Sequence, residues 1–228
     1  MKQARNHAII DRSEYFGNYT EMGIIMKDQG ITGVVLAGGR SKRMGKNKAL
    51  LQLGNVTMIE QVVSTLKLLF QEIIVVTNTP EEYDMLKGVR LVEDYIQSSV
   101  RSSLNGLYSG LLTAKNKYIF ATACDMPLLS LPLIKYMREQ IEDQDIIIPC
   151  VNGYHEPLHS FYSKNCLAPM KRQLDQKDYR ISNFFSEVKV TTVQESAIRK
   201  FDPYLHSFLN INSFEEYHTL KNIFLKNQ

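Results

Sequence analysis

The segment from residue 31 to residue 48 constrains the fold more than any other part of the chain. It begins with the apolar run 34–37, which is typical of a strand buried on both faces of a parallel sheet. The run stops at Gly38 and Gly39, where a backbone without Cβ atoms can turn sharply and approach a ligand closely. Five cationic side chains follow within nine residues, namely Arg40, Lys42, Arg43, Lys46 and Lys48. A buried strand that leads into a glycine turn and a cationic loop favours an anionic ligand at the carboxyl end of the strand.

A cationic cluster of this kind also fits a solvated surface loop, and charge alone does not separate the two interpretations. Spacing excludes two familiar phosphate-binding motifs. A P-loop requires G-x-x-x-x-G-K-[ST], but the interval from Gly39 to Gly45 is one residue too long, and Lys46 is followed by Asn47. The dinucleotide-binding fingerprint G-x-G-x-x-G is absent from this segment.

Strands and amphipathic helices alternate after residue 48. Strands are expected over 73–76, 89–92, 117–123 and 146–148, and helices over 57–70, 81–87, 104–112 and 130–141. The first of these helices begins with a capping box made by Thr57 and Glu60. Repeated strand–helix units predict an α/β, Rossmann-like three-layer fold with a mostly parallel central sheet and helices on both faces.

Several polar segments follow predicted strands directly. They are 31–48 after its own apolar run, residues 77–78, Asp94 and Asp125. Sheets of this class bind ligands beyond the carboxyl ends of their strands. We therefore expect these segments to meet at a single site.

The second half of the chain is less regular. Asn152 and Gly153 predict a hairpin turn. Helices are expected over 163–174 and about 180–186, and strands over 188–193 and 208–211. Ser213 and Glu216 form the capping box of a closing helix. Without a repeat or a flexible linker, residues 31–228 are expected to form one domain.

Residues 1–30 are interpreted as an N-terminal extension without identifiable chemistry. They mix polar and charged residues with short apolar runs and lack the hydrophobic region of a secretory signal. In the whole chain no apolar run approaches the ~20 residues of a membrane span. The three cysteines, Cys124, Cys150 and Cys166, are widely spaced and form neither a disulfide framework nor a C-x-x-C site. We therefore expect a cytoplasmic protein.

The net charge gives no support for a general nucleic-acid role. It is only +3, from 27 basic and 24 acidic residues, so the positive charge matters locally around residues 40–48. His155 and His159 are closely spaced, but cysteine or carboxylate companions at metal-ligand spacing are missing, which disfavours a zinc site.

The complete pattern L-A-G-G-x-x-x-R-M-G-x-x-K is present over residues 36–48. It resembles the signature of nucleotidyltransferases, and most closely that of the molybdenum cofactor guanylyltransferases. Further segments resemble the same family over residues 124–127, 156–162 and 210–216. The similarity extends from Ile31 to about Tyr217. It implies a nucleotidyltransferase domain over residues 31–228 that depends on Mg²⁺.

The resemblance also implies the roles of individual residues. Asp125 would hold Mg²⁺, and Arg43 and Lys48 would stabilise negative charge on the phosphates. The residues it assigns to the nucleotide are Leu36, Ala37, Gly38, Gly39, Lys48, Asn78, Asp94, Leu104, Gly106 and Asp125. Those it assigns to the acceptor are Glu156, Pro157, His159, Asn210 and Asn212.

Some of these assignments leave alternatives open. From the residues alone, Asp125 and Asp94 also fit turn or helix-capping aspartates. Thr77 can be aligned in place of Asn78. Ser102 and Ser103 replace the Gly-Pro that usually precedes the position of Leu104.

The reaction implied by the resemblance is transfer of GMP from GTP to the molybdenum-molybdopterin cofactor, with release of pyrophosphate. Other cofactor-biosynthesis proteins and molybdoenzyme chaperones are implied as partners. Related cytidylyl- and sugar-phosphate nucleotidyltransferases share the loop and remain an alternative. A non-catalytic nucleotide-binding regulatory protein is another, although binding alone does not require both Lys48 and Asp125.

Overall fold

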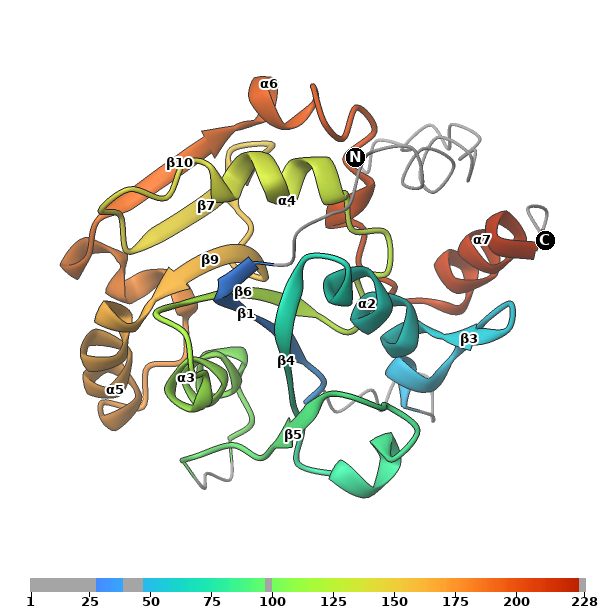
Figure 1. The fold of residues 1–228 in the computed structure, drawn as a ribbon, viewed down its shortest axis with the longest axis horizontal. Coiled ribbons are helices and arrows are strands. Elements are labelled where there is room, and N and C mark those ends of the chain that lie inside the picture. Colours follow the sequence, from blue (N-terminus) through green and yellow to red (C-terminus); the bar gives the residue numbers. More distant parts are fainter. Residues whose placement is uncertain (1–27, 39–46, 97–99, 226–228) are drawn as a thin grey trace.

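A computed structural model of the chain describes residues 28–38, 47–96 and 100–225. These residues form an eight-stranded sheet with helices packed against both faces (Figure 1). The strand order is β10-β7-β9-β6-β1-β4-β5, and β8 pairs with β7. The strands are β1 (Asp28–Leu36), β4 (Phe70–Val76), β5 (Arg90–Val92), β6 (Tyr118–Ala123), β7 (Ile146–Val151), β8 (Tyr154–His155), β9 (His159–Ser163) and β10 (Val190–Gln194). The predicted α/β class is confirmed.

Most of the sheet is parallel, as expected. Strands β5, β4, β1 and β6 are parallel neighbours, whereas β9 pairs antiparallel with both β6 and β7. The chain runs outward from β1 through β4 to β5 and then returns to place β6 on the other side of β1. The carboxyl ends of β1 and β6 therefore flank a topological switch point, which is where open α/β sheets bind ligands.

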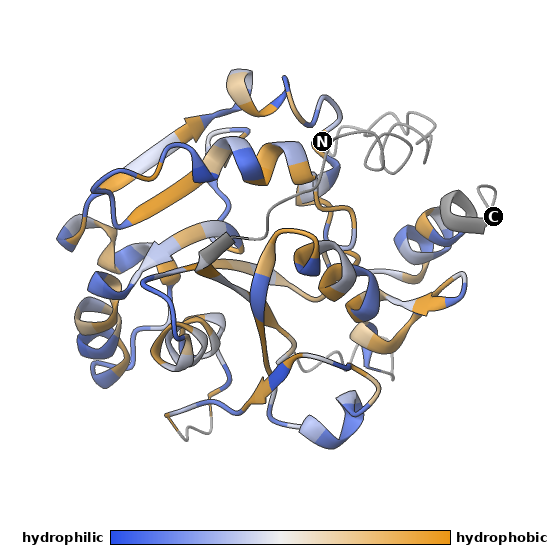
Figure 2. Cartoon of the chain, in the orientation of Figure 1, coloured by the Kyte–Doolittle hydropathy of each residue, from blue (hydrophilic) through white to orange (hydrophobic). Residues whose placement is uncertain are grey.

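Two apolar layers separate the sheet from its helices. Helices α2 (Met58–Lys67) and α4 (Leu131–Arg138) cover one face, and α3 (Ser103–Thr113) and α5 (Leu167–Asp175) cover the other. Figure 2 shows the resulting pattern of hydrophobic strands between helices of mixed hydropathy. Along β1, Val35 faces the first layer and Val34 faces the second, so this strand is apolar on both sides.

The α3 helix lies unusually close to β1. A Cβ atom on Gly110 would lie 2.5 Å from Cγ1 of Val34. Glycine at this position therefore permits the close packing of helix and strand.

A third apolar cluster holds the end of the chain against the β2–β3 hairpin. Strands β2 (Gln52–Leu53) and β3 (Val56–Thr57) pair with each other, and α7 (Phe214–Leu225) packs beside them. The Tyr217 hydroxyl donates a hydrogen bond to the Gln52 carbonyl at 2.8 Å. The Ile211 N–H, which bonds to the Asp125 carbonyl just after β6, places the segment before α7 near the carboxyl edge of the main sheet.

Several local predictions are confirmed. Thr57 and Glu60 form the capping box of α2, and Ser213 and Glu216 exchange the corresponding hydrogen bonds at the start of α7. The β7–β8 hairpin turns at Asn152 and Gly153, whose φ values are 51° and 80°. The short η4 (Lys164–Cys166), η5 (Ile181–Glu187) and α6 (Glu195–Ile198) complete this half.

Two predicted elements are wrong. The helix expected over 81–87 is only a 3-10 turn, η3 (Pro80–Tyr83), because within 81–87 only Tyr83 and Leu86 are buried. The strand expected over 208–211 is irregular chain after η6 (His206–Phe208). The Ile211 N–H of that segment bonds to the Asp125 carbonyl instead of a neighbouring strand.

Strand β1 begins at Asp28, so the predicted border after residue 30 falls inside the sheet. Residues 1–27 of the expected extension lie outside the described residues. Among the helices of the described chain, none has the length and apolar composition needed to cross a bilayer.

Candidate functional site at the carboxyl edge of the sheet

The segments predicted to share a site do meet at one edge of the sheet. Hydrogen bonds continue past the strand ends from the N–H groups of Ala37 to Val76 O (2.8 Å), Thr77 to Val92 O (2.8 Å) and Cys124 to Leu36 O (3.1 Å). Gly38, Asn78 and Asp125 each follow one of these residues directly. The pairing of the strands therefore places the three segments that begin at these residues side by side at the switch point.

Asp125 is half-buried at this edge, immediately after Cys124. Burial raises the pKa of its carboxyl group above the ordinary value, and the nearby Lys48 ammonium opposes that rise. Its backbone carbonyl accepts a hydrogen bond from the Ile211 N–H at 3.1 Å. A partly desolvated carboxylate gains from added positive charge, so this position suits a cation.

Lys48 connects the beginning and the end of the fold. It is the first residue of η2 (Lys48–Leu50), and its Nζ donates a hydrogen bond to Asn212 Oδ1 at 3.0 Å. Asn212 in turn donates from Nδ2 to the Asn210 carbonyl at 3.3 Å. Asn210 and Asn212 are both exposed.

Asn78 and Asp94 form a reciprocal pair. Asn78 Nδ2 donates to Asp94 Oδ2 at 2.8 Å, and the Asp94 N–H donates to Asn78 Oδ1 at 3.0 Å. Burial raises the pKa of Asp94, while the Asn78 hydrogen bond and the charge of Arg101 oppose the rise. Thr77 is buried, and its hydroxyl contacts Thr79. The pairing favours Asn78 over Thr77 as the polar group on this side of the site.

Tyr83 is a site residue that the sequence motifs missed. It is fully buried, and its hydroxyl donates to the Ala37 carbonyl at 3.3 Å and accepts from Asn47 Nδ2 at 2.9 Å. The Asn47 side-chain oxygen accepts from the Ala49 N–H and thereby caps η2. The position of Asn47 directly before Lys48 was the one available sequence signal for this contact.

Glu156 and Pro157 lie in the turn that leads into β9, at the same edge of the sheet. The Ser160 hydroxyl donates to the Glu156 carbonyl at 2.7 Å, and the Tyr162 hydroxyl donates to the Pro157 carbonyl at 2.8 Å. Both residues are half-buried, so the turn is fixed but partly open to solvent.

His159 does not fit its predicted role in binding the acceptor. Its side chain is fully buried, with the rings of Phe120 and Phe208 at 5.1 Å and 4.9 Å. Burial lowers its pKa to about 3, which keeps the imidazole neutral. The His155 side chain is exposed, so the two histidines do not form a metal pair either.

The comparisons with known proteins agree with this geometry. The MobA-like NTP transferase domain matches residues 33–191, which is more than half of the chain. This chain belongs to the MobA-like NTP transferase family. A relative from Natranaerobius thermophilus, named "Probable molybdenum cofactor guanylyltransferase", is 40% identical over 189 residues, covering 82% of this chain and 92% of the relative. The molybdenum cofactor guanylyltransferase of Desulfosudis oleivorans is 38% identical over 188 residues, with the same two coverages of 82% and 92%.

Solved structures share the fold of this family member. Molybdopterin-guanine dinucleotide biosynthesis protein A from Archaeoglobus fulgidus superposes with a TM-score of 0.73 at 24% identity, covering 86% of this chain and 99% of that one. The 4-diphosphocytidyl-2C-methyl-D-erythritol synthase of Anaerococcus prevotii superposes with a TM-score of 0.61 at 16% identity, covering 87% and 96%. The fold is therefore common to proteins whose names point to different nucleotides.

The segment before α3 departs from the usual family pattern without losing its helix start. Ser102 occupies the N-cap position and accepts a hydrogen bond from the Asn105 N–H at 3.1 Å. The Leu104 side chain is fully buried in the core, so it stabilises α3 and is not available to contact a nucleotide. A Cβ on Gly106 would lie 3.4 Å from Leu36 and 3.8 Å from Asp94, which places this glycine beside the site.

Asp125 is the carboxylate at this edge that could take part in holding a divalent cation. Within residues 28–38, 47–96 and 100–225, no group of three or more His, Cys, Asp or Glu side chains is arranged to hold a metal ion. Mg²⁺ commonly takes one or two protein carboxylates and completes its shell with substrate phosphates and water. Asp125 meets that requirement. Gly39 and Arg43, both predicted to act on the phosphates, lie outside the described residues.

Proposed function

We propose that this protein transfers GMP from GTP to the molybdenum-molybdopterin cofactor, forming molybdopterin guanine dinucleotide and pyrophosphate. The names of its relatives from N. thermophilus and D. oleivorans support this activity. The observation that carries the proposal is the meeting of Lys48, Asp125 and the Asn210–Asn212 segment at the switch point. One place thereby holds a lysine that can bind phosphate, a carboxylate that can bind a metal ion, and the exposed amides of two asparagines.

In this proposal the terminal phosphate of the acceptor attacks the α-phosphorus of GTP in line. The new bond joins acceptor oxygen and α-phosphorus, and the bond from the α-phosphorus to the bridging oxygen of the leaving pyrophosphate breaks. Lys48 stabilises the charge that grows on the pyrophosphate, together with Arg43. Exposed Asn210 and Asn212 orient the acceptor, and Glu156 and Pro157 border it. Catalysis then consists of positioning and charge neutralisation, without covalent participation of a side chain.

Asp125 is the proposed ligand of Mg²⁺. When bound, the ion would neutralise phosphate charge and help to orient the triphosphate. Partial burial raises the pKa of the Asp125 carboxyl group, the Lys48 ammonium opposes that rise, and a bound cation would lower the pKa further. Asn78 and Asp94 are proposed to bind the nucleotide from the opposite side, next to Gly106.

The same fold serves a protein named for a cytidylyl product, so the base must be tested directly. Purified protein with Mg²⁺ and the molybdenum-molybdopterin cofactor is mixed in turn with GTP, CTP, ATP and UTP. Released pyrophosphate and the mass of the dinucleotide product are measured. We expect product from GTP; product from CTP alone would replace this proposal with the cytidylyl alternative. Binding without any product would favour the regulatory alternative.

The carboxylate of Asp125 can be tested by an isosteric change. Asp125→Asn should reduce turnover at least a hundredfold, because it removes the only charge on the proposed metal ligand. Asp143→Asn, at an exposed carboxylate paired with Lys189, is the matched control and should transfer GMP at the wild-type rate. Circular dichroism checks that both variants fold. Turnover of Asp125→Asn within a few-fold of wild type would remove Asp125 from the mechanism.

We further propose the cytoplasm as the place of this reaction. Other cofactor-biosynthesis proteins and molybdoenzyme chaperones are the partners we expect to supply the acceptor and receive the product.

A further inference from the structure

The hydroxyl of Tyr83 joins two segments of the site that are not adjacent in the sequence. It donates to the Ala37 carbonyl at the end of β1 and accepts from Asn47 Nδ2. A phenol group has one proton to donate and lone pairs to accept, so both bonds can form at once. The Tyr83 side chain is fully buried, and its bond to the Ala37 carbonyl lies in the interior, where water does not compete for it.

Asn47 transmits this contact to Lys48. One Nδ2 proton goes to Tyr83 and the other to the Glu82 carboxylate, while Oδ1 accepts from the Ala49 N–H at 3.1 Å. With the amide fixed from both ends, the first turn of η2 is fixed as well. That turn begins with Lys48, whose ammonium reaches Asn212.

We propose that Tyr83 is a positioning residue for Lys48, acting by tying the end of β1 to the capped turn that carries the lysine. The proposal rests on the proposed function, because it takes Lys48 as the group that binds the triphosphate. Lysine has a long, flexible side chain, so the placement of its ammonium depends on a fixed backbone. A phenylalanine at position 83 would fill nearly the same volume but would form neither of the two hydrogen bonds of the hydroxyl.

The state of the hydroxyl is compatible with this role. Burial raises the pKa of Tyr83 to about 12, against a smaller lowering by the Asn47 hydrogen bond. The group therefore keeps its proton near neutral pH, and that proton is the one donated to the Ala37 carbonyl.

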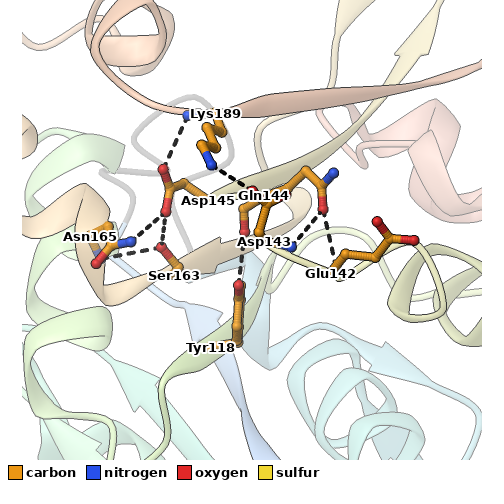
Figure 3. Close-up of polar contacts among 8 residues, drawn as sticks. All are labelled: Tyr118, Glu142, Asp143, Gln144, Asp145, Ser163, Asn165 and Lys189. Carbon is orange, nitrogen blue, oxygen red and sulfur yellow. Dashed lines mark hydrogen bonds and ion pairs between the residues drawn. The ribbon is translucent and has the colours of Figure 1, made fainter.

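The test compares Tyr83→Phe with Tyr118→Phe. Tyr118 is also buried, and its hydroxyl donates to the Gln144 carbonyl at 2.8 Å at the opposite edge of the sheet (Figure 3). Each variant is measured for the Kd of MgGTP and for the midpoint of urea unfolding. We expect Tyr83→Phe to weaken GTP binding about tenfold, as loss of buried hydrogen bonds to the site does. Tyr118→Phe should lower the urea midpoint similarly and leave the Kd unchanged.

A double variant separates positioning from general destabilisation. If Tyr83 acts through Lys48, Tyr83→Phe should weaken GTP binding little further once Lys48→Ala is present. Asn47→Ala should reproduce the Tyr83→Phe defect, since it breaks the same connection. A wild-type Kd in Tyr83→Phe would overturn the proposal, as would a full tenfold loss in the Lys48→Ala background.

A second measurement distinguishes failure of this inference from failure of the proposed function. If the wild-type protein binds no GTP, the assignment of a GTP-dependent transfer is wrong. The rate at which acetic anhydride modifies Lys48, followed by mass spectrometry with the exposed Lys200 as an internal reference, still tests the connection. Tyr83→Phe should change the relative rate at Lys48 several-fold, whereas Tyr118→Phe should not. An unchanged rate would mean that Tyr83 does not position the lysine.

Discussion

Asp145 connects three strands at the edge of the sheet opposite the candidate site. Its substitution should lower the free energy of unfolding and leave the affinity for the nucleotide unchanged. Its carboxylate is buried and accepts hydrogen bonds from Ser163 Oγ (2.8 Å), Asn165 Nδ2 (2.8 Å) and the Lys189 N–H (3.1 Å) (Figure 3). These contacts connect the starts of β7 and β10 with the end of β9. Asp145→Asn keeps the shape of this side chain and removes its charge.

The geometry gives the size of the effect. Oδ1 takes the bonds from Ser163 and Asn165, and Oδ2 takes the bond from Lys189. An asparagine can present its oxygen to the first two donors, but its NH₂ group then faces the Lys189 N–H. One hydrogen bond is lost and two lose their charge assistance, which together cost about 3 kcal/mol in the free energy of unfolding. For a chain of this size that lowers Tm by about 6–12 °C.

The pH dependence has a definite sign. Burial alone would raise the pKa of Asp145, but the hydrogen bonds from Lys189, Ser163 and Asn165 outweigh it and hold the pKa below its ordinary value. A lowered folded pKa stabilises the protein above the unfolded pKa of about 4, and that stabilisation is lost as the pH falls through the folded value. The difference between wild type and Asp145→Asn should therefore be full at pH 7 and shrink below about pH 4.

Urea unfolding of wild type, Asp145→Asn and Asp143→Asn at pH 7 and at pH 3.5 measures both effects. Asp143 forms an exposed ion pair with the Lys189 side chain, so its variant should unfold nearly as the wild type does. Equal urea midpoints for Asp145→Asn and Asp143→Asn would contradict the assigned role of the Asp145 carboxylate. So would a difference between wild type and Asp145→Asn that grows as the pH is lowered.

Three further predictions concern the site and its support. Lys48→Ala should reduce the rate of pyrophosphate release far more than Lys42→Ala, because the motif assigns Lys48, and not Lys42, to the phosphates. Equal losses would mean that the cationic residues act only through their combined electrostatic potential. Gly38→Ala should leave the urea midpoint unchanged but weaken GTP binding, since a Cβ there meets nothing within 4 Å among the described residues and would project into the proposed phosphate site. Gly110→Ala, whose Cβ would lie 2.5 Å from a methyl group of β1, should instead lower the free energy of unfolding by about 1–3 kcal/mol. A chain that begins at Asp28 should keep the wild-type rate of GMP transfer, and a folded truncated protein without transfer would show that residues 1–27 belong to the functional unit.

The parts of the fold that the sequence predicted are those governed by local rules. Buried strands, capping boxes and the turn at Asn152 and Gly153 each depend on a few neighbouring residues, and the structure confirms them. The polar groups that follow parallel strands were expected at one edge because that consequence of topology needs no knowledge of side-chain contacts. Gly38, Asn78 and Asp125 were found in this way.

The environments of His159 and Tyr83 were not predicted because they depend on packing against elements that are distant in the sequence. His159 lies in β9, whose residues are all buried, so no alternation of polar and apolar residues marks the side chain as internal. The 3-10 turn that carries Tyr83 looked like the start of a helix because Pro80 suits a first turn. Neither position could be recognised without the elements that pack against it.

The segment Asn210–Asn212 shows that a sequence motif can identify residues without showing which of them are in contact. The resemblance assigned Lys48 to the phosphates and Asn212 to the acceptor, as if to two separate subsites. In the structure they share a hydrogen bond across 164 residues of sequence, and the Ile211 N–H is bonded to the carbonyl of Asp125. The segment is thereby hydrogen-bonded both to Lys48 and to the backbone of Asp125. We therefore expect the proposed acceptor and nucleotide subsites to be coupled through these two hydrogen bonds. Asn212→Ala should raise the Kd of MgGTP as well as that of the acceptor in titration calorimetry, and an unchanged Kd of MgGTP would contradict the coupling.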